Sequence, residues 1–389
     1  MIIIGGIDLF NLSSQAYLDN SATTPVCDSA IEAINRSIRD CWGNPSSLHN
    51  IGTVAFSEQK KAREILADRL SCQTSEIYFT AGGTDGNNIA LYGAARRNSG
   101  KGKRIVTTEI EHPSVREVFK KLEAEGYDVV YLGVGKDGKI SIQDLIKAVT
   151  KDTCLVSIMH VNNEVGSIQP IEAVRVAVTR AGSRALIHCD AVQSFGKIVT
   201  RPLSMGVDMM TVSSHKIHGP KGAGALYIKR GTNLAPHIVG GGQENGIRPG
   251  TEPMPAIMGF SAAVSSLPNI QKQLAETAAI RDYMVFRLRQ TDGVVINSPD
   301  DACPYITNFS VLGVPSQTMV TFLSEHGVYV SGGSACAKGH RSHVLTAMGL
   351  APEIIDSAIR VSLSRFNTKL HIDMLIEGIK LAKDRISRV

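Results

Sequence analysis

Residues 207–222 read VDMMTVSSHKIHGPKG, so that an apolar run is followed directly by a turn-forming segment. The run at 207–212 predicts a buried strand, and Gly219 and Pro220 predict the turn after it. Lys216 therefore lies at a strand end, between a hydroxyl group and an imidazole. Such surroundings can make a lysine amine a nucleophile toward aldehydes.

Short β-rich runs alternate with longer helical patterns on both sides of this stretch. The expected strands are 77–80, 104–107, 128–131, 155–158, 185–188, 209–212 and 224–227. The expected helices are 85–97, 113–125, 141–149 and 171–181. This alternation predicts an α/β fold with a mostly parallel central sheet covered on both faces. Ligands of such folds bind beyond the carboxyl ends of the strands.

The last third of the chain predicts a second, smaller α/β unit, entered through a long helical stretch at 255–290. Its expected strands are 294–296, 306–311 and 359–363, and its expected helices are 316–325 and 369–388. We therefore expect a large domain at 16–258 and a small domain formed by 1–15 and 259–389.

Length and composition are those of an ordinary globular protein. The chain has 389 residues, of which 43% are hydrophobic and 20% are charged. No apolar stretch is long enough to cross a bilayer, and the N-terminus lacks the basic segment of a signal peptide. The net charge of +5 is spread along the chain. We therefore expect a cytoplasmic protein that binds neither membranes nor nucleic acid directly.

Asp190 follows a second apolar run, Ala185-Leu186-Ile187-His188-Cys189. A lysine that forms a Schiff base and an aspartate for the pyridinium nitrogen are the pair that pyridoxal phosphate needs, so Lys216 and Asp190 together predict this cofactor. Gln193 could reach the ring oxygen. Taken alone, Asp190 is better explained as a helix cap.

The segment Gly82-Gly83-Thr84-Asp85-Gly86-Asn87-Asn88 follows the first expected strand of the large domain and opens a helix. Bare amides at a helix N-terminus and the Thr84 hydroxyl suit a phosphate group. The spacing fits neither a dinucleotide fingerprint nor a P-loop, and an ordinary glycine cap is the alternative. Ser213 and His215 would supply further phosphate donors.

Three more polar residues lie at expected strand ends or on a strand. His112 precedes a proline at a helix start, where the helix dipole disfavours a protonated ring. A neutral ring could stack on a flat cofactor and also take a proton, which makes His112 a candidate catalytic residue. Asn163, in Asn162-Asn163-Glu164-Val165-Gly166, could bind a phenolic oxygen or a carboxylate. Arg360, on a strand of the small domain, could grip a carboxylate. A capping histidine, turn asparagines and a solvent-facing arginine are the alternatives.

The seven cysteines form no C-x-x-C pair, so neither a disulfide framework nor a metal site is expected. Cys336 differs from the others because it follows Ser331-Gly332-Gly333-Ser334-Ala335, a run of small residues that predicts a mobile loop. Lys338, His340 and Arg341 make its surroundings positive, which favours a thiolate. A nucleophile is therefore expected at Cys336, with an exposed surface thiol as the alternative.

Taken together, these segments resemble a cysteine desulfurase of the NifS/IscS type, within the class-V aminotransferases. The resemblance extends from Tyr17-Leu18-Asp19-Asn20-Ser21-Ala22-Thr23-Thr24 to Arg360-Val361-Ser362-Leu363-Ser364-Arg365-Phe366. It also includes Asn44-Pro45-Ser46-Ser47-Leu48-His49 and Gly240-Gly241-Gly242-Gln243-Glu244. It implies the fold of a PLP-dependent transferase of fold type I, and a homodimer with the site at the interface.

The resemblance also implies cofactor roles at matching positions. Lys216 would bind pyridoxal phosphate covalently, Asp190 would hold its pyridinium nitrogen, and His112 would stack on its ring. Gln193 and Asn163 would contact the ring from the side.

The remaining roles concern the phosphate, the substrate and the sulfur. Thr251 would reach the phosphate from a second subunit, and Arg360 would bind the substrate carboxylate together with Asn163. Cys336 would take the sulfur of L-cysteine as a persulfide, release alanine, and pass the sulfur to an acceptor protein such as an iron–sulfur scaffold. The phosphate-binding residues within one chain would be Gly83, Thr84, Ser213 and His215.

Three departures from the family pattern bear on partners. The chain stops at Val389, so the extended tail that some members use to dock a scaffold protein is expected to be missing. The stretch from Cys336 to Met348-Gly349 is slightly shorter than in the longest-loop members, and Asp85 replaces a usual glutamate.

Two alternative functions stay open. The first is another enzyme of the same fold, an aminotransferase or a selenocysteine lyase, and only Cys336 distinguishes a desulfurase from these. The second is a catalytically silent family member that is kept as a binding partner in sulfur transfer.

Overall fold

The protein is described from a computed structural model, which covers residues 3–4, 7–8, 15–100, 102–332 and 341–386. A seven-stranded sheet with the order β4-β10-β9-β8-β7-β5-β6 forms the larger part of the molecule. In it, β10 runs antiparallel to β4 and β9, whereas the other neighbours pair in parallel. The predicted mostly parallel sheet is confirmed. Its strands are β4 (Ile77–Thr80), β5 (Arg104–Thr108), β6 (Asp128–Leu132), β7 (Thr153–Ser157), β8 (Leu186–Asp190), β9 (Met209–Ser213) and β10 (Gly224–Ile228).

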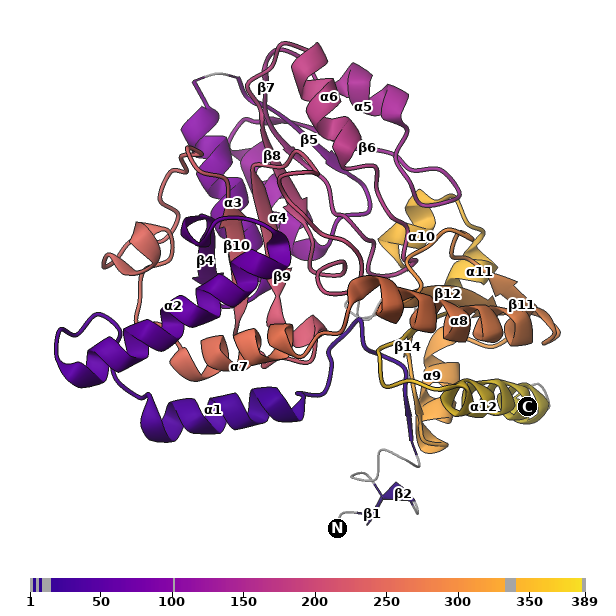
Figure 1. Ribbon diagram of the computed structural model, residues 1–389. Helices are drawn as coiled ribbons and strands as arrows, with labels where there is room; N and C mark the ends of the chain where they lie inside the picture. The colour runs from indigo at the N-terminus through magenta and orange to yellow at the C-terminus, as the bar shows by residue number, and fades with distance from the viewer. Residues whose placement is uncertain (1–2, 5–6, 9–14, 101, 333–340, 387–389) are drawn as a thin grey trace.

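Helices cover both faces of this sheet, as Figure 1 shows. Met209 and Leu155 pack with α3 and α4, while Met210 and Val156, one position further along each strand, pack with the helices of the opposite face. Successive side chains of a strand point to opposite faces, so a strand covered on both sides is apolar throughout. The covering helices are α3 (Gly83–Asn98) and α4 (Pro113–Ala124) on one face and α2 (Asn50–Leu70), α5 (Ile142–Ala148), α6 (Glu172–Arg180) and α7 (Met254–Ser265) on the other.

The smaller part is built on a four-stranded antiparallel sheet with the order β11-β12-β15-β14. Phe309 and Val361 on this sheet pack against Met319 and Ile376, which come from two helices. Ala16, far away in sequence, belongs to the same core. Its elements are α8 (Ile270–Arg289), β11 (Val294–Ile296), β12 (Ile306–Val311), α9 (Ser316–Glu325), β13 (Val328–Tyr329), β14 (Ser331–Gly332), α10 (His343–Ala347), α11 (Pro352–Asp356), β15 (Ala358–Ser362) and α12 (Lys369–Ile386), with β3 (Ala16–Tyr17) paired to β13.

The helical stretch expected at 255–290 is two helices, α7 and α8, so its continuity was wrongly predicted. Pro268 disfavours helical backbone at the residue before it. Asn269 then caps α8, because its Oδ1 accepts hydrogen bonds from the backbone N–H groups of Gln271 and Lys272 at 3.0 and 3.2 Å. The assignment of 16–258 and of 1–15 with 259–389 to two domains stays a prediction.

The remaining described elements are short or lie at the edge of the large sheet. α1 (Asp28–Asp40) packs against α7, which also packs against α2, in a lobe beside the β4 edge (Figure 1). Within the described ranges, none of the helices combines the length and apolarity needed to span a membrane. The short elements are β1 (Ile3–Ile4), β2 (Ile7–Asp8) and the 3-10 turns η2 (Thr74–Glu76), η3 (Ser214–Lys216) and η4 (Gln243–Gly246).

Candidate active site

The loops at the carboxyl ends of the parallel strands, together with β15, enclose a cavity of about 390 Å³. Thr251 is exposed and does not line this cavity. Cys336 lies outside the described residues. The other predicted site residues all line it: Gly83, Thr84, His112, Asn163, Asp190, Gln193, Ser213, His215, Lys216 and Arg360.

Asp190 ends β8 and is held by neutral donors. Its Oδ2 accepts a hydrogen bond from Asn87 Nδ2 at 2.8 Å, and its Oδ1 accepts one from the backbone N–H of Val192 at 3.0 Å. The hydrogen bond from Val192 is the kind of local cap that the sequence analysis gave as the alternative role of Asp190. Asp190 therefore both caps a turn and lines the cavity. Because neither donor is charged, the full negative charge of Asp190 is available to a cation in the cavity.

Asn87 also lines the cavity, although the sequence did not predict it as a site residue. It lies in the second turn of α3, is fully buried, and connects two cavity residues. Its Nδ2 also donates to Ser114 Oγ at 2.9 Å, and this hydroxyl lies 2.8 Å from His112 Nδ1. The only sequence signal was its position in the glycine-rich segment that opens α3. A buried amide thus connects Asp190 to His112.

His112 is the N-cap of α4, with a proline at the first helical position, as predicted. Burial, with the nearby charge of Lys216, lowers the pKa of His112, although Asp190 acts in the opposite direction. Its Nδ1 accepts a hydrogen bond from the backbone N–H of Ser114 at 3.1 Å. In a neutral ring the proton is therefore on Nε2. A neutral, flat imidazole on the cavity wall suits stacking on an aromatic ligand.

Lys216 ends η3, directly after β9. Its Nζ donates hydrogen bonds to the backbone oxygen of Ser21 and, at 2.7 Å, to that of Ala22. Gln193 Nε2 donates to the same Ser21 oxygen at 3.0 Å. The segment around Ser21 thus positions both side chains, a role that no local pattern in the sequence indicated.

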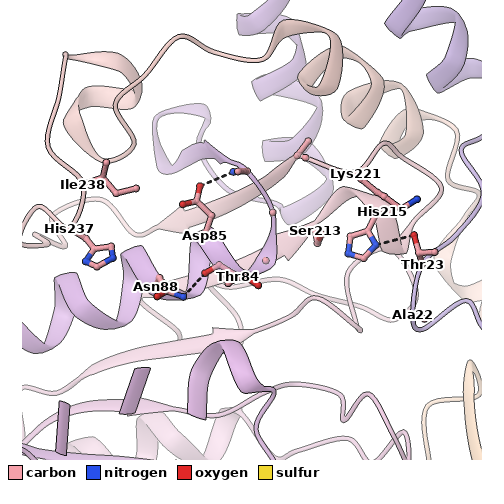
Figure 2. A pocket seen from close by; sticks show the side chains of 15 residues that line it. Ala22, Thr23, Thr84, Asp85, Asn88, Ser213, His215, Lys221, His237 and Ile238 are labelled. Carbon is pink, nitrogen blue, oxygen red and sulfur yellow. Dashed lines mark hydrogen bonds between the residues drawn. The ribbon is translucent and has the colours of Figure 1, made fainter. Parts of the chain in front are cut away.

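The phosphate candidates lie where this cavity meets a wider, more open pocket of about 870 Å³, shown in Figure 2. A Cβ on Gly83 would lie 2.8 Å from Val192 Cγ2, so a larger residue at the start of α3 would force the Val192 side chain to move. Ser213 Oγ is buried and has no hydrogen-bond partner among the described residues. His215 Nδ1 lies 3.2 Å from Thr23 Oγ1. Burial, with the charges of Lys216 and Lys221, lowers the pKa of His215 to about 4.

These residues fit pyridoxal phosphate. The unpaired hydroxyl of Ser213, a neutral imidazole and the first amides of α3 form a donor set for a phosphate. The buried carboxylate of Asp190 suits a protonated pyridine nitrogen, and the Lys216 amine, which lines the same cavity, suits the aldehyde of the cofactor. Within the described ranges, no group of three or more histidine, cysteine or acidic side chains could hold a metal ion.

Arg360 is only 3% exposed, which excludes the solvent-facing alternative. Its Nη2 donates to Asp19 Oδ1 at 2.8 Å and to Ser331 Oγ at 3.1 Å, and its Nη1 donates to the backbone oxygen of Asn163 at 3.1 Å. Its Nε is buried without a partner among the described residues. The guanidinium is therefore fixed in place, and its charge is shared with the carboxylate of Asp19.

The two neighbouring asparagines have different roles. Asn162 is fully buried, and its Oδ1 accepts from the backbone N–H groups of Glu164 and Val165 at 2.8 and 3.0 Å, as a turn asparagine does. Asn163 lines the cavity. The Glu164 carboxylate accepts a hydrogen bond from Ser342 Oγ, and burial raises the pKa of Glu164 to about 7.

The chain was compared with known proteins. The family model for class-V aminotransferases matches residues 16–375. A cysteine desulfurase of Nostoc sp. (strain PCC 7120) is 40% identical over 382 residues, which cover 96% of this chain and 94% of the relative. A solved NifS-like protein superposes with a TM-score of 0.89 at 37% identity, covering 96% of this chain and all of that one. The structure of SspA in complex with cysteine superposes with a TM-score of 0.80 at 35% identity over 91% of this chain.

Proposed function

We propose that this chain, which belongs to the class-V aminotransferase family, is a pyridoxal-phosphate-dependent cysteine desulfurase that converts L-cysteine to L-alanine and supplies sulfur for iron–sulfur clusters or other sulfur-containing cofactors. One observation carries the proposal. The Lys216 amine, the Asp190 carboxylate and the unpaired Ser213 hydroxyl line the same cavity, with Arg360 beside them.

The chain's own residues would hold the cofactor at distinct points. Asp190 would pair with the pyridine nitrogen, and His112 would cover the ring face. Ser213, His215 and the α3 amides would bind the phosphate, with Thr84 among them. When bound, pyridoxal phosphate supplies an aldehyde for the lysine and an electron sink for the bond changes at the substrate's Cα and Cβ.

Arg360 and Asn163 would orient the substrate. Among the described residues, the Nε–H of Arg360 has no partner and one N–H of Nη1 is not used, so these groups are left for a carboxylate ligand, which a guanidinium binds well. Lys216 would take and return the proton at the substrate Cα, since its amine is freed when the amino acid takes its place. The SspA relative has been solved with cysteine, which supports L-cysteine as the amino acid here.

In the sulfur-transfer step, Cys336 would act as the nucleophile. Its thiolate would attack the substrate sulfur, so that an S–S bond forms while the C–S bond of the substrate breaks. The electron pair of the broken bond stays with carbon, which is then protonated and leaves as alanine. Cys336 would be left with a persulfide for an acceptor protein, such as an iron–sulfur scaffold in the cytoplasm.

The test separates cofactor binding from sulfur transfer. The purified protein with pyridoxal phosphate should absorb visible light, and Lys216→Ala should abolish the borohydride-stable attachment of the cofactor. Cys336→Ala should keep the absorbance and lose sulfide and persulfide formation from L-cysteine. Cys27→Ala, which removes a different thiol that is partly accessible, is the matched control and should keep both. Undiminished sulfide release by Cys336→Ala would contradict the persulfide step.

We propose further that the protein is a homodimer. Apolar side chains are exposed on and between α1 and α2, including Trp42 at 66%, Leu48 at 100% and Phe56 at 54%. An exposed group of this kind is typical of an interface. Phe56→Asp should weaken the dimer in sedimentation experiments, whereas Phe286→Asp, at the similarly exposed (58%) Phe286 on α8, should not. Because Thr251 would then bind the phosphate of the other subunit, Phe56→Asp should also weaken cofactor binding.

A further inference from the structure

Lys197 is a buried amine to which the roles above assign no task. It is 4% exposed and lies four residues after Gln193, in the turn that follows β8. Its Nζ donates a hydrogen bond to Gln193 Oε1 at 3.2 Å and lies 5.8 Å from the centre of the Tyr305 ring. Burial lowers the pKa of Lys197 to about 8. A buried amine whose acceptor is a neutral amide is costly, which calls for an explanation.

The turn is built to direct this side chain inward. Gly196, just before Lys197, has a φ of +74°, which L side chains rarely adopt. A Cβ at this position would also lie 2.9 Å from Leu267 Cδ1 and 3.0 Å from Ile217 Cγ2. The backbone therefore passes tightly between neighbours, and Lys197 follows it into the protein interior.

Gln193 is held at both ends of its amide. Its Nε2 donates to the Ser21 oxygen at 3.0 Å, while its Oε1 accepts from Lys197. Exchanging the two amide atoms would place oxygen against oxygen at Ser21 and N–H against N–H at Lys197. Both contacts would become repulsive, so one orientation is fixed. In this orientation the second N–H of Nε2 is left for an acceptor in the cavity that Gln193 lines.

We propose that Lys197 is a positioning residue, which locks the Gln193 amide so that it offers an N–H group to the ring oxygen of bound pyridoxal phosphate. Lys197 does not line the cavity and acts only through Gln193. The inference rests on the proposed function, because the acceptor belongs to that cofactor. A lysine is suited to the task because an ammonium group can only donate, so it excludes the flipped amide.

The first experiment is Lys197→Met, an apolar side chain of similar length. The dissociation constant of pyridoxal phosphate, from an absorbance titration of the apoprotein, should rise about tenfold, as expected for a hydrogen bond whose donor is no longer oriented. The thermal midpoint of the apoprotein should stay the same or rise, because the buried amine is replaced by an apolar group. A purely structural lysine would lower the midpoint without a selective effect on the cofactor.

A double-mutant cycle decides whether the effect passes through Gln193. In a Gln193→Ala background, Lys197→Met should cause no further loss of cofactor affinity. A pyridoxal phosphate analogue without the ring hydroxyl gives a second check, since the wild type and Lys197→Met should bind it equally. Additive losses in the cycle, or an unchanged dissociation constant in Lys197→Met, would overturn the inference. A wild-type protein that binds no pyridoxal phosphate would instead refute the proposed function.

Discussion

Asp190 and Arg360 carry opposite charges into one cavity, and their partners differ in kind. Among the described residues, the hydrogen-bond donors to Asp190 are an amide and a backbone N–H, neither of which is charged. Arg360 is paired with the carboxylate of Asp19, at 2.8 Å. The first arrangement suits a cofactor that stays bound, because the full charge is available to it. The second suits a substrate that must leave, because Asp19 already offsets part of the positive charge with which Arg360 would attract the substrate carboxylate.

The largest effect is expected from Asp190→Asn, which removes the negative charge that would hold the pyridine nitrogen. Breaking a buried charge pair costs about 3–5 kcal/mol, so pyridoxal phosphate binding and alanine formation should each fall by about a hundredfold or more. The control is Asp208→Asn, another buried aspartate, which is paired with Arg175 at 2.7 Å outside the cavity. It should reduce stability and leave cofactor affinity unchanged. Equal cofactor affinity in wild type and Asp190→Asn would show that the charge of Asp190 does not hold the cofactor.

Arg360→Lys should act on the substrate and leave the cofactor in place. A lysine keeps the charge and loses the paired N–H groups, which are worth about 1.5–3 kcal/mol when they bind a charged partner. We expect kcat/KM for L-cysteine to fall about ten- to hundredfold, with unchanged visible absorbance. Arg365→Lys is the matched control, since Arg365 donates to Ser266 oxygens and does not line the cavity. Loss of the visible absorbance in Arg360→Lys would contradict this prediction and show that Arg360 holds the cofactor.

Asp19→Asn tests whether the carboxylate of Asp19 weakens substrate binding, because the asparagine keeps an acceptor for Arg360 and removes the competing negative charge. The KM for L-cysteine should fall severalfold, because more of the positive charge of Arg360 is then available to the substrate carboxylate. Steady-state kinetics of the two proteins at one ionic strength measures this. A raised KM would mean that Asp19 chiefly orients the guanidinium.

The last prediction concerns stability and not catalysis, and it tests Glu164, which lies near Arg360. Burial raises the pKa of Glu164 to about 7 from its ordinary 4.5. The stability contributed by its protonated form is thus fully present below pH 4.5 and is lost as the pH rises through 7. The free energy of unfolding of Glu164→Gln, minus that of the wild type, should therefore increase from pH 5 to pH 8. Denaturant titrations at several pH values measure the difference, and a flat profile would contradict it.

Local patterns in the sequence predicted most of the fold and the candidate residues. The strand bounds at 77–80, 294–296 and 306–311 were correct, because runs of β-branched and aromatic residues ending at turn formers are local signals. The strand ends then placed Asp190 and Lys216 on one cavity. Pro268 was also visible, yet the helix break before Asn269 was not predicted.

Only the tertiary structure decided what surrounds each charge. Asn87 reaches Asp190 from helix α3, Asp19 reaches Arg360 from a segment 341 residues away, and Lys197 becomes an orienting group because the fold buries it. The sequence by itself determined which side chains stand at strand ends, since that follows from neighbours along the chain. Whether a charge is met by an amide, a carboxylate or nothing depends on contacts between distant segments, and these form only when the sheet, its helices and the smaller part pack together.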